Sequence, residues 1–229
     1  PNKTLMPTVN IAPAIGWPND LMPQATAGTK VNVFASGLNH PRWLTVLPNG
    51  DVLVAETNAP PKPASESSIK GWVMKMVMKR AGAGVSSPNR IILLRDTNND
   101  GLADQRSVFL EGLNSPFGMT LVGEHLYVAN ADALMRFNYI ENNVKIAGAG
   151  EKVIDLPGGP INHHWTKDII ASPDGTKLYA TVGSNSNVGE NGIENEAGRA
   201  AVLEVDIASG STRIFASGLR NPNGLSWQP

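Results

Sequence analysis

Residues 218–225 read GLRNPNGL, and related stretches read GLNHPRWL at 37–44, GLNSPFGM at 112–119 and NHHWTKDI at 162–169. The third position of the four stretches is, in chain order, Asn39, Asn114, His164 and Arg220. Each of these residues lies five positions before an apolar residue that we expect to open a strand. After three of the copies, a stretch containing glycine leads into a second apolar run. The repeat therefore predicts a series of similar β-rich units.

Units of roughly 45 to 75 residues, made of short strands and turns rich in glycine, asparagine, aspartate and proline, are typical of β-propeller blades. Blades are four-stranded sheets that pack around a central channel, so equivalent positions of successive blades lie near one axis. We therefore expect His164 and Arg220 to converge at the mouth of the channel. The predicted fold is an all-β propeller, of which this chain supplies three complete blades and the first strand of a fourth.

The composition agrees with an all-β domain, since the 229 residues include 23 Gly and 17 Pro and are 41% hydrophobic. A net charge of -1 argues against a nucleic-acid partner, which would require a concentrated basic surface. There are no cysteines, so disulfides are excluded. No apolar run approaches the roughly 20 residues of a membrane span. The first residues of the chain do not begin a signal peptide.

The expected organisation is an extended arm over residues 1–30 and a partial propeller over 31–229 that starts with a strand at 31–34. Residues 57–88 read as a surface insertion, because 57–63 contain too many prolines for a strand. Within it, 71–80 favour a short amphipathic helix whose apolar side either packs or lies at a membrane surface. An incomplete propeller exposes unpaired strand edges. We expect further sequence or a second chain to supply the remaining blades.

The loop 96–104 has the spacing of a calcium site. Its candidate ligands are the side chains of Asp96, Asn98, Asp100 and Asp104 and the backbone carbonyl of Leu102. An EF-hand is unlikely, because Ser107 stands where that motif carries its bidentate glutamate. Apolar runs on both sides predict instead a β-hairpin loop that holds a structural calcium ion. A solvated turn without metal is the alternative.

His163 and His164 form the one adjacent pair among four histidines. Neighbouring residues on a strand point to opposite faces, so these two rings would not readily chelate one metal ion. The position that His164 shares with Arg220 favours a catalytic role over a purely structural one. The loop 183–192 that follows is rich in asparagine, serine and glycine. It is either a solvated loop or a polar wall for a polyhydroxylated ligand.

Residues 164–183 and 218–225 resemble the soluble quinoprotein glucose/sorbosone dehydrogenases, most closely the L-sorbosone dehydrogenase branch. The resemblance extends over roughly residues 31–229. It implies a six-bladed propeller that holds pyrroloquinoline quinone (PQQ) and calcium, in a periplasmic or secreted enzyme. The implied reaction is oxidation of an aldose or a sugar aldehyde such as L-sorbosone by hydride transfer to PQQ, with a further electron acceptor.

The same resemblance assigns His164 to the general base, Arg220 to the arginine beside the quinone carbonyl, and Asn221 to a cofactor-contacting amide. An imidazole titrates near working pH, and a permanent cation stabilises developing negative charge. Ser184 stands where the glucose enzymes carry an aspartate. The residue that orients His164 is then expected among Asn185, Asn187 and Glu190. The family's later blades supply further cofactor ligands, so this chain alone is expected not to bind PQQ tightly.

Two other functions are compatible with a propeller. A calcium-dependent lactonase would place carboxylate and amide ligands at the axis, whereas the four equivalent positions hold no carboxylate and Arg220 would repel a cation. A non-enzymatic recognition propeller would leave the shared position of His164 and Arg220 without a role. The sequence therefore favours the PQQ-dependent dehydrogenase.

Overall fold

The computed structural model describes residues 12–13, 15–16, 21–61, 69–81, 85–159 and 161–228. The chain divides into two compact units. One unit comprises residues 1–31 and 63–86 and contains helix α1 (Ile69–Arg80), which confirms the helix expected at 71–80. Most of the expected arm and parts of the insertion lie outside the described residues. None of the helices in the described part of the chain has the length and hydropathy needed to span a membrane.

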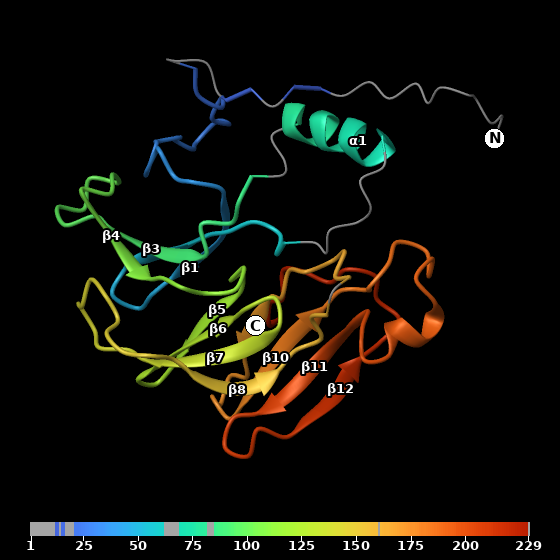
Figure 1. Ribbon diagram of the computed structural model, residues 1–229. Helices are drawn as coiled ribbons and strands as arrows, with labels where there is room; N and C mark the ends of the chain where they lie inside the picture. The colour runs from blue at the N-terminus through green and yellow to red at the C-terminus, as the bar shows by residue number, and fades with distance from the viewer. Residues whose placement is uncertain are drawn as a thin grey trace. The chain divides into compact units, whose positions relative to one another are not determined.

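The second unit comprises residues 32–62 and 87–229 and contains three antiparallel sheets of four strands (Figure 1). Blade 1 contains β1 (Pro41–Val46), β2 (Val52–Glu56), β3 (Arg90–Arg95) and β4 (Gln105–Leu110). Blade 2 contains β5 (Met119–Val122), β6 (His125–Ala129), β7 (Ala133–Asn138) and β8 (Glu151–Asp155). Blade 3 contains β9 (Ile169–Ala171), β10 (Lys177–Val182), β11 (Ala201–Asp206) and β12 (Thr212–Ala216), with the short 3-10 helix η1 (Ile193–Glu196) before β11. Strands pair in chain order within each blade.

Blade 2 buries both of its faces, because successive side chains of a strand point to opposite sides. Leu126 and Val128 of β6 pack toward blade 1, whereas Tyr127 and Ala129 pack toward blade 3. Their fully buried partners are Leu53, Ile91 and Leu93 in blade 1 and Leu178, Ala180 and Val205 in blade 3. Burial of one such aliphatic side chain contributes about 1.5–3 kcal/mol. The blades are thus joined by two apolar layers.

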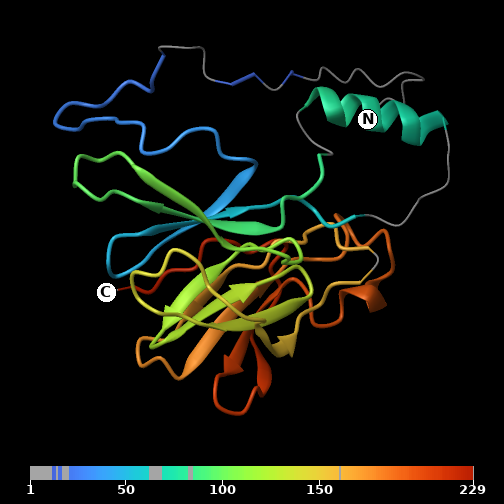
Figure 2. The same cartoon turned by 60° about the vertical axis from the view of Figure 1, so that its left-hand side comes forward.

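The first strands of the three blades lie side by side, with β5 next to both β1 and β9 (Figure 2). Thr45 Oγ1 in β1 donates a hydrogen bond to the Met119 carbonyl at 3.1 Å. The Gly118 N–H donates to the Lys167 carbonyl at 2.9 Å, which joins the segments that precede β5 and β9. Hydrogen bonds therefore join the innermost strands of neighbouring blades, or the segments directly before them.

Two of the four expected strand starts are confirmed, since β5 begins at Met119 and β9 at Ile169. The start expected at Leu44 is wrong, because a bulge between Pro41 and Trp43 lets the β1 ladder extend back to Pro41. The start expected at Leu225 is wrong, because the described residues 225–228 pair with no strand, and the Leu225 N–H donates to the Asp168 carboxylate. Residues 31–34 are not a strand either.

Candidate active site

His164 lies in the segment that leads into β9, and its ring contacts the first residues of the β10–β11 loop. Its Nδ1 atom is 2.9 Å from the Ser184 carbonyl oxygen and 3.0 Å from Ser184 Oγ. The Ser184 hydroxyl in turn donates to the Ser186 carbonyl at 2.7 Å. His164 is half-buried and Ser184 is buried. The imidazole is therefore held at one nitrogen by a single residue.

These contacts determine which nitrogen of His164 carries the proton in the neutral ring. A carbonyl oxygen only accepts hydrogen bonds, and the single hydroxyl proton of Ser184 is used toward Ser186. Both atoms that face Nδ1 are thus acceptors, so Nδ1 is the donor. The neutral imidazole then carries its lone pair on Nε2. A ring held in this way presents Nε2 as the atom that can take a proton.

Arg220 and Asn221 follow blade 3 and reach the same loop. The Ser184 N–H donates to the Arg220 carbonyl at 2.8 Å. The exposed Arg220 guanidinium donates from Nη2 to Asn187 Oδ1 at 2.7 Å and from Nε to the Asn187 carbonyl at 3.2 Å. His164 and Arg220 therefore meet on one short segment, residues 184–187, as the repeat predicts for equivalent positions.

Gly183 allows His164 and Asn221 to approach each other. A Cβ atom at this position would overlap the Cβ of His164 and would lie 2.7 Å from Asn221 Oδ1. Its backbone φ is not in the left-handed region, so the need for glycine here comes from space and not from conformation. Gly183, directly after β10, thus leaves the space in which His164 and Asn221 come close together.

The expected partners of His164 were wrong, because Ser184 orients the ring and the three candidates make other contacts. Asn185 Nδ2 donates to the Ile161 carbonyl, and Asn187 holds Arg220. Glu190 accepts the backbone N–H groups of Asn187 and Val188, which lower its pKa to about 2. The main acceptor for the His164 ring is the backbone carbonyl of Ser184. Because every residue type has such a carbonyl, the pattern of side chains could not identify Ser184 as the partner.

Asp168 is a further site residue that the sequence analysis did not single out. Its carboxylate is only 2% exposed. Oδ2 accepts the N–H groups of Gly224 and Leu225 at 3.0 Å each, and Oδ1 accepts the N–H of Ile169 at 2.9 Å. Burial raises the pKa of Asp168, against the opposing effect of these three hydrogen bonds. Asp168 ties the segment after Arg220 to the start of β9.

Lys167 is also buried and was likewise missed. The side chain is fully buried, and its ammonium donates to the Trp165 carbonyl at 3.3 Å. Burial, with the positive charge of Arg199 as a second cause, lowers the pKa of Lys167 to about 7. The sequence did contain a signal for both residues, since Lys167 and Asp168 lie between the apolar residues Trp165 and Ile169. Charged residues seldom occur within a buried stretch unless they have a structural or functional role.

The loop 96–104 connects β3 and β4, which confirms the expected hairpin. Asp96 accepts the N–H groups of Asp100 and Gly101, and these backbone donors, with Gly101 foremost, lower its pKa. Asp104 accepts from Thr97 at 2.8 Å. In the part of the chain that the structure describes, no three acidic or histidine side chains are grouped as a metal site. The five-ligand calcium set stays a prediction, with its oxygen donors on one short loop.

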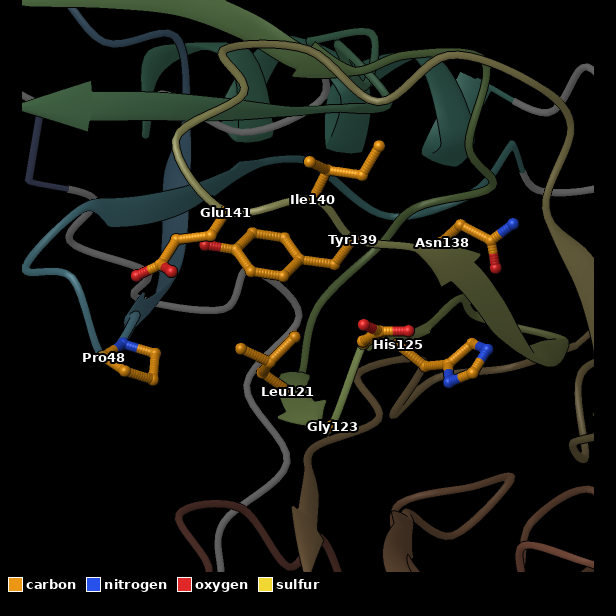
Figure 3. Close-up of a pocket in the computed structure, with 9 residues that line it drawn as sticks. Pro48, Leu121, Gly123, His125, Asn138, Tyr139, Ile140 and Glu141 are labelled. Atoms are coloured by element: carbon orange, nitrogen blue, oxygen red, sulfur yellow. The ribbon is translucent and has the colours of Figure 1, made fainter.

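A cavity of about 650 Å³ lies at the other end of the inner strands (Figure 3). Its lining includes Leu121, His125, Tyr139 and Glu141, which cluster around the β5–β6 turn and the segment after β7. His164 and Gly118, by contrast, lie where β9 and β5 begin. The cavity is therefore remote from His164 and Arg220, and it is not part of the candidate site.

Three successive four-stranded meanders with adjacent first strands are the blades of a β-propeller. Solved structures support this fold. The chain is 15% identical to the calcium structure of the family AA12 enzyme of Trichoderma reesei, with 87% of this chain and 45% of that chain covered at a TM-score of 0.61. The chain is also 17% identical to the holo form of the pyranose dehydrogenase PQQ domain of Coprinopsis cinerea. That match covers 82% of this chain and 41% of that chain at a TM-score of 0.58.

The chain belongs to the TrAA12-like family, whose model matches residues 23–229. It spans less than half of the length of the two solved structures described above. No curated protein sequence matches the chain. The expected family resemblance is thus confirmed as membership of the TrAA12-like family, and the solved structures with the same fold include a pyranose dehydrogenase PQQ domain. The L-sorbosone branch stays a prediction.

Proposed function

We propose that the chain is part of a PQQ-dependent dehydrogenase that oxidises an aldose or a sugar aldehyde such as L-sorbosone, the latter as its hydrate. The observation that carries the proposal is the tautomer of His164. Ser184 occupies Nδ1, so Nε2 is the unprotonated nitrogen and is available to a substrate hydroxyl. Family membership and the solved PQQ domain with the same fold support the redox chemistry.

In the proposed reaction, Nε2 of His164 takes the proton of a substrate hydroxyl as general base. When bound, PQQ would supply the oxidising power, as the acceptor of the hydride from the carbon that carries this hydroxyl; that carbon then becomes a carbonyl carbon. Arg220 would hold the quinone side of the site, because its permanent charge offsets the negative charge of the reduced ring. The amide of Asn221 would contact the cofactor. Asn187 fixes the guanidinium of Arg220 in advance of binding.

The remaining parts of the site are also proposals. We assign the further cofactor ligands to later blades, supplied by further sequence or by a second chain, and expect electrons to pass to a separate acceptor. The hairpin loop 96–104 would bind a structural calcium ion through Asp96, Asn98, Asp100, Asp104 and the Leu102 carbonyl. A periplasmic or secreted location goes with this assignment.

The test compares His164→Ala with His163→Ala in the complete natural protein reconstituted with PQQ and calcium. Reduction of an artificial dye in the presence of an aldose is measured for both. Loss of the general base should lower turnover about 10²–10⁴-fold in His164→Ala. His163 is exposed, and His163→Ala should retain the activity of the unmodified protein.

Three results would contradict the proposal. Turnover of His164→Ala close to that of His163→Ala would remove His164 from the base role. Release of acid from a lactone without any electron acceptor would favour the lactonase instead. Absence of both activities in a protein that binds sugar would favour a recognition propeller.

A further inference from the structure

Glu196, at the end of η1, holds the segment that contacts His164, although it does not touch the ring. Its Oε2 accepts the Asn185 N–H at 2.7 Å, and its Oε1 accepts the Ser186 N–H at 3.0 Å. The Ser186 hydroxyl donates to the same Oε1. Burial raises the pKa of Glu196, but these hydrogen bonds outweigh burial and the pKa is lowered overall. Glu196 is therefore a carboxylate at neutral pH with three donors directed at it.

The anchored peptide determines where the Ser184 proton goes. Because Glu196 binds both the N–H and the hydroxyl of Ser186, the Ser186 carbonyl is left to receive the Ser184 hydroxyl at 2.7 Å. Ser186 Oγ in turn accepts the N–H of Gly189 at 2.9 Å, so its own proton is committed to Glu196. Each hydroxyl in the series has one proton, and each proton has one acceptor.

The consequence reaches His164. With its proton used toward Ser186, Ser184 Oγ can only accept from the ring, as can the Ser184 carbonyl. If the Ser186 peptide turned away, the Ser184 hydroxyl could instead donate to Nδ1 in competition with the Ser184 carbonyl, which still favours Nδ1–H, and a larger share of the neutral imidazole would carry its proton on Nε2. In that form, Nε2 has no lone pair for a substrate proton. The Ser184 carbonyl and a carboxylate two residues removed along the hydrogen-bond chain therefore act together on the tautomer.

We propose that Glu196 is a positioning residue that, through Ser186 and the Ser184 hydroxyl, reinforces the Nδ1–H tautomer of His164 favoured by the Ser184 carbonyl, and so keeps Nε2 free to act as a base. This inference rests on the proposed function. It adds a second set of residues to the site, in which a remote carboxylate acts through two serines where a direct carboxylate neighbour of His164 is missing.

The test substitutes Glu196→Gln, which keeps the size of the side chain but replaces one acceptor oxygen by a donor. The matched control is Glu194→Gln, an exposed acid on the same 3-10 helix. Long-range ¹H–¹⁵N correlation spectra of the complete protein, labelled at histidine and assigned with His164→Ala, report which ring nitrogen is protonated. We expect Nδ1–H in the unmodified protein and in Glu194→Gln, and a shift toward Nε2–H in Glu196→Gln.

Activity provides the second readout. Substitution of an outer residue that orients a histidine typically lowers function about 10–100-fold. We expect that loss in kcat for Glu196→Gln, with KM little changed, because the substrate contacts are preserved. An unchanged tautomer in Glu196→Gln would overturn the inference. The spectra do not depend on turnover, so failure of the proposed function, seen as an active His164→Ala, is distinguishable from failure of this inference.

A double-variant cycle separates the relay from simple disruption of the loop. Ser184→Ala removes Oγ but keeps the backbone carbonyl that faces Nδ1. If Glu196 acts through the Ser184 hydroxyl, Glu196→Gln should cause no further change of tautomer in the Ser184→Ala background, since the two effects share one path. Additive changes in the double variant would show that Glu196 acts by holding the loop in general, and would overturn the relay.

Discussion

The loops 96–104 and 183–200 both connect neighbouring strands within a blade and are both rich in acids and amides, yet they are held in different ways. In the loop 96–104, the carboxylates accept N–H groups of the same loop, as Asp96 does from Asp100 and Gly101. The loop 183–200 is joined instead to distant segments, through the contact of Ser184 with His164 and that of Asn187 with Arg220. The acidic part of the first loop is thus held by its own backbone, and its link to a distant segment is the Ala103 N–H donating to the Phe34 carbonyl at 2.8 Å. The second loop is held in addition at the two candidate site residues, His164 and Arg220.

This difference indicates where each loop is sensitive. A self-contained turn tolerates changes in its surroundings but depends on its own backbone and on any ion it binds. The conformation of a loop that is bonded to distant segments depends also on how closely those segments pack, so an added atom between them should disturb it. The three predictions below separate these two kinds of sensitivity.

The largest effect is expected from Gly183→Ala. The new methyl group would overlap His164 and meet Asn221 Oδ1, so the two segments must move apart. We expect a loss of about 1–3 kcal/mol in the free energy of unfolding from overpacking. Displacement of His164 by about 1 Å should lower kcat/KM about 10²-fold. Urea denaturation and steady-state kinetics of the complete protein measure the two quantities.

The control is Gly50→Ala in the β1–β2 turn of blade 1. Gly50 has a φ of +89°, and no atom lies within 4 Å of an added Cβ. The cost there should come only from the left-handed backbone, about 1–2 kcal/mol, without loss of activity. Equal loss of activity in both variants would mean that the site responds to general destabilisation, and that the space at Gly183 has no special role.

The same contrast explains how much could be predicted from the sequence. The hairpin at 96–104 was predictable because its signal is local, consisting of nine turn-forming residues between two apolar runs. The strand starts at Met119 and Ile169 were predictable because the repeat has a fixed offset from the third position of each copy. The repeat could not predict that the described residues 225–228 form no strand, nor the contact of the Leu225 N–H with Asp168, which spans 57 positions.

Within the candidate site, the repeat predicted the convergence of His164 and Arg220, but not the contacts that hold them. Ser184 orients His164 mainly by position, because its carbonyl is an acceptor that every residue type possesses. Asp168 and Glu196 hold backbone N–H groups whose location depends on how the loops fold. Such contacts follow from three-dimensional packing and leave no spacing pattern in the sequence.

Calcium removal should produce a smaller effect, confined to the loop 96–104. A ligand that binds only the folded state raises its stability, so a chelator should lower the melting temperature of the unmodified protein by a few degrees. Asp96→Ala should abolish this difference, because it removes the first ligand of the set. Asp174→Ala, in the exposed β9–β10 turn, is the matched control and should keep the full response. An identical melting curve with and without chelator would exclude calcium from the loop.

The smallest effect is expected on acidification toward pH 2, which tests whether protonation of one carboxylate in a loop changes contacts beyond that loop. The N–H groups of Asn187 and Val188 lower the pKa of Glu190 from 4.5 to about 2, so this contribution is present above pH 4.5 and is lost as the pH falls toward about 2. Protonation should release Asn187 and with it Arg220, whereas protonation of Asp96 should disturb only Gly101 and its neighbours. NMR titration should therefore show the Arg220 Nε–H signal moving together with the Asn187 amide, and Glu190→Gln should remove both changes. An Arg220 signal that stays constant while the Asn187 amide titrates would mean that this loop is as self-contained as the hairpin.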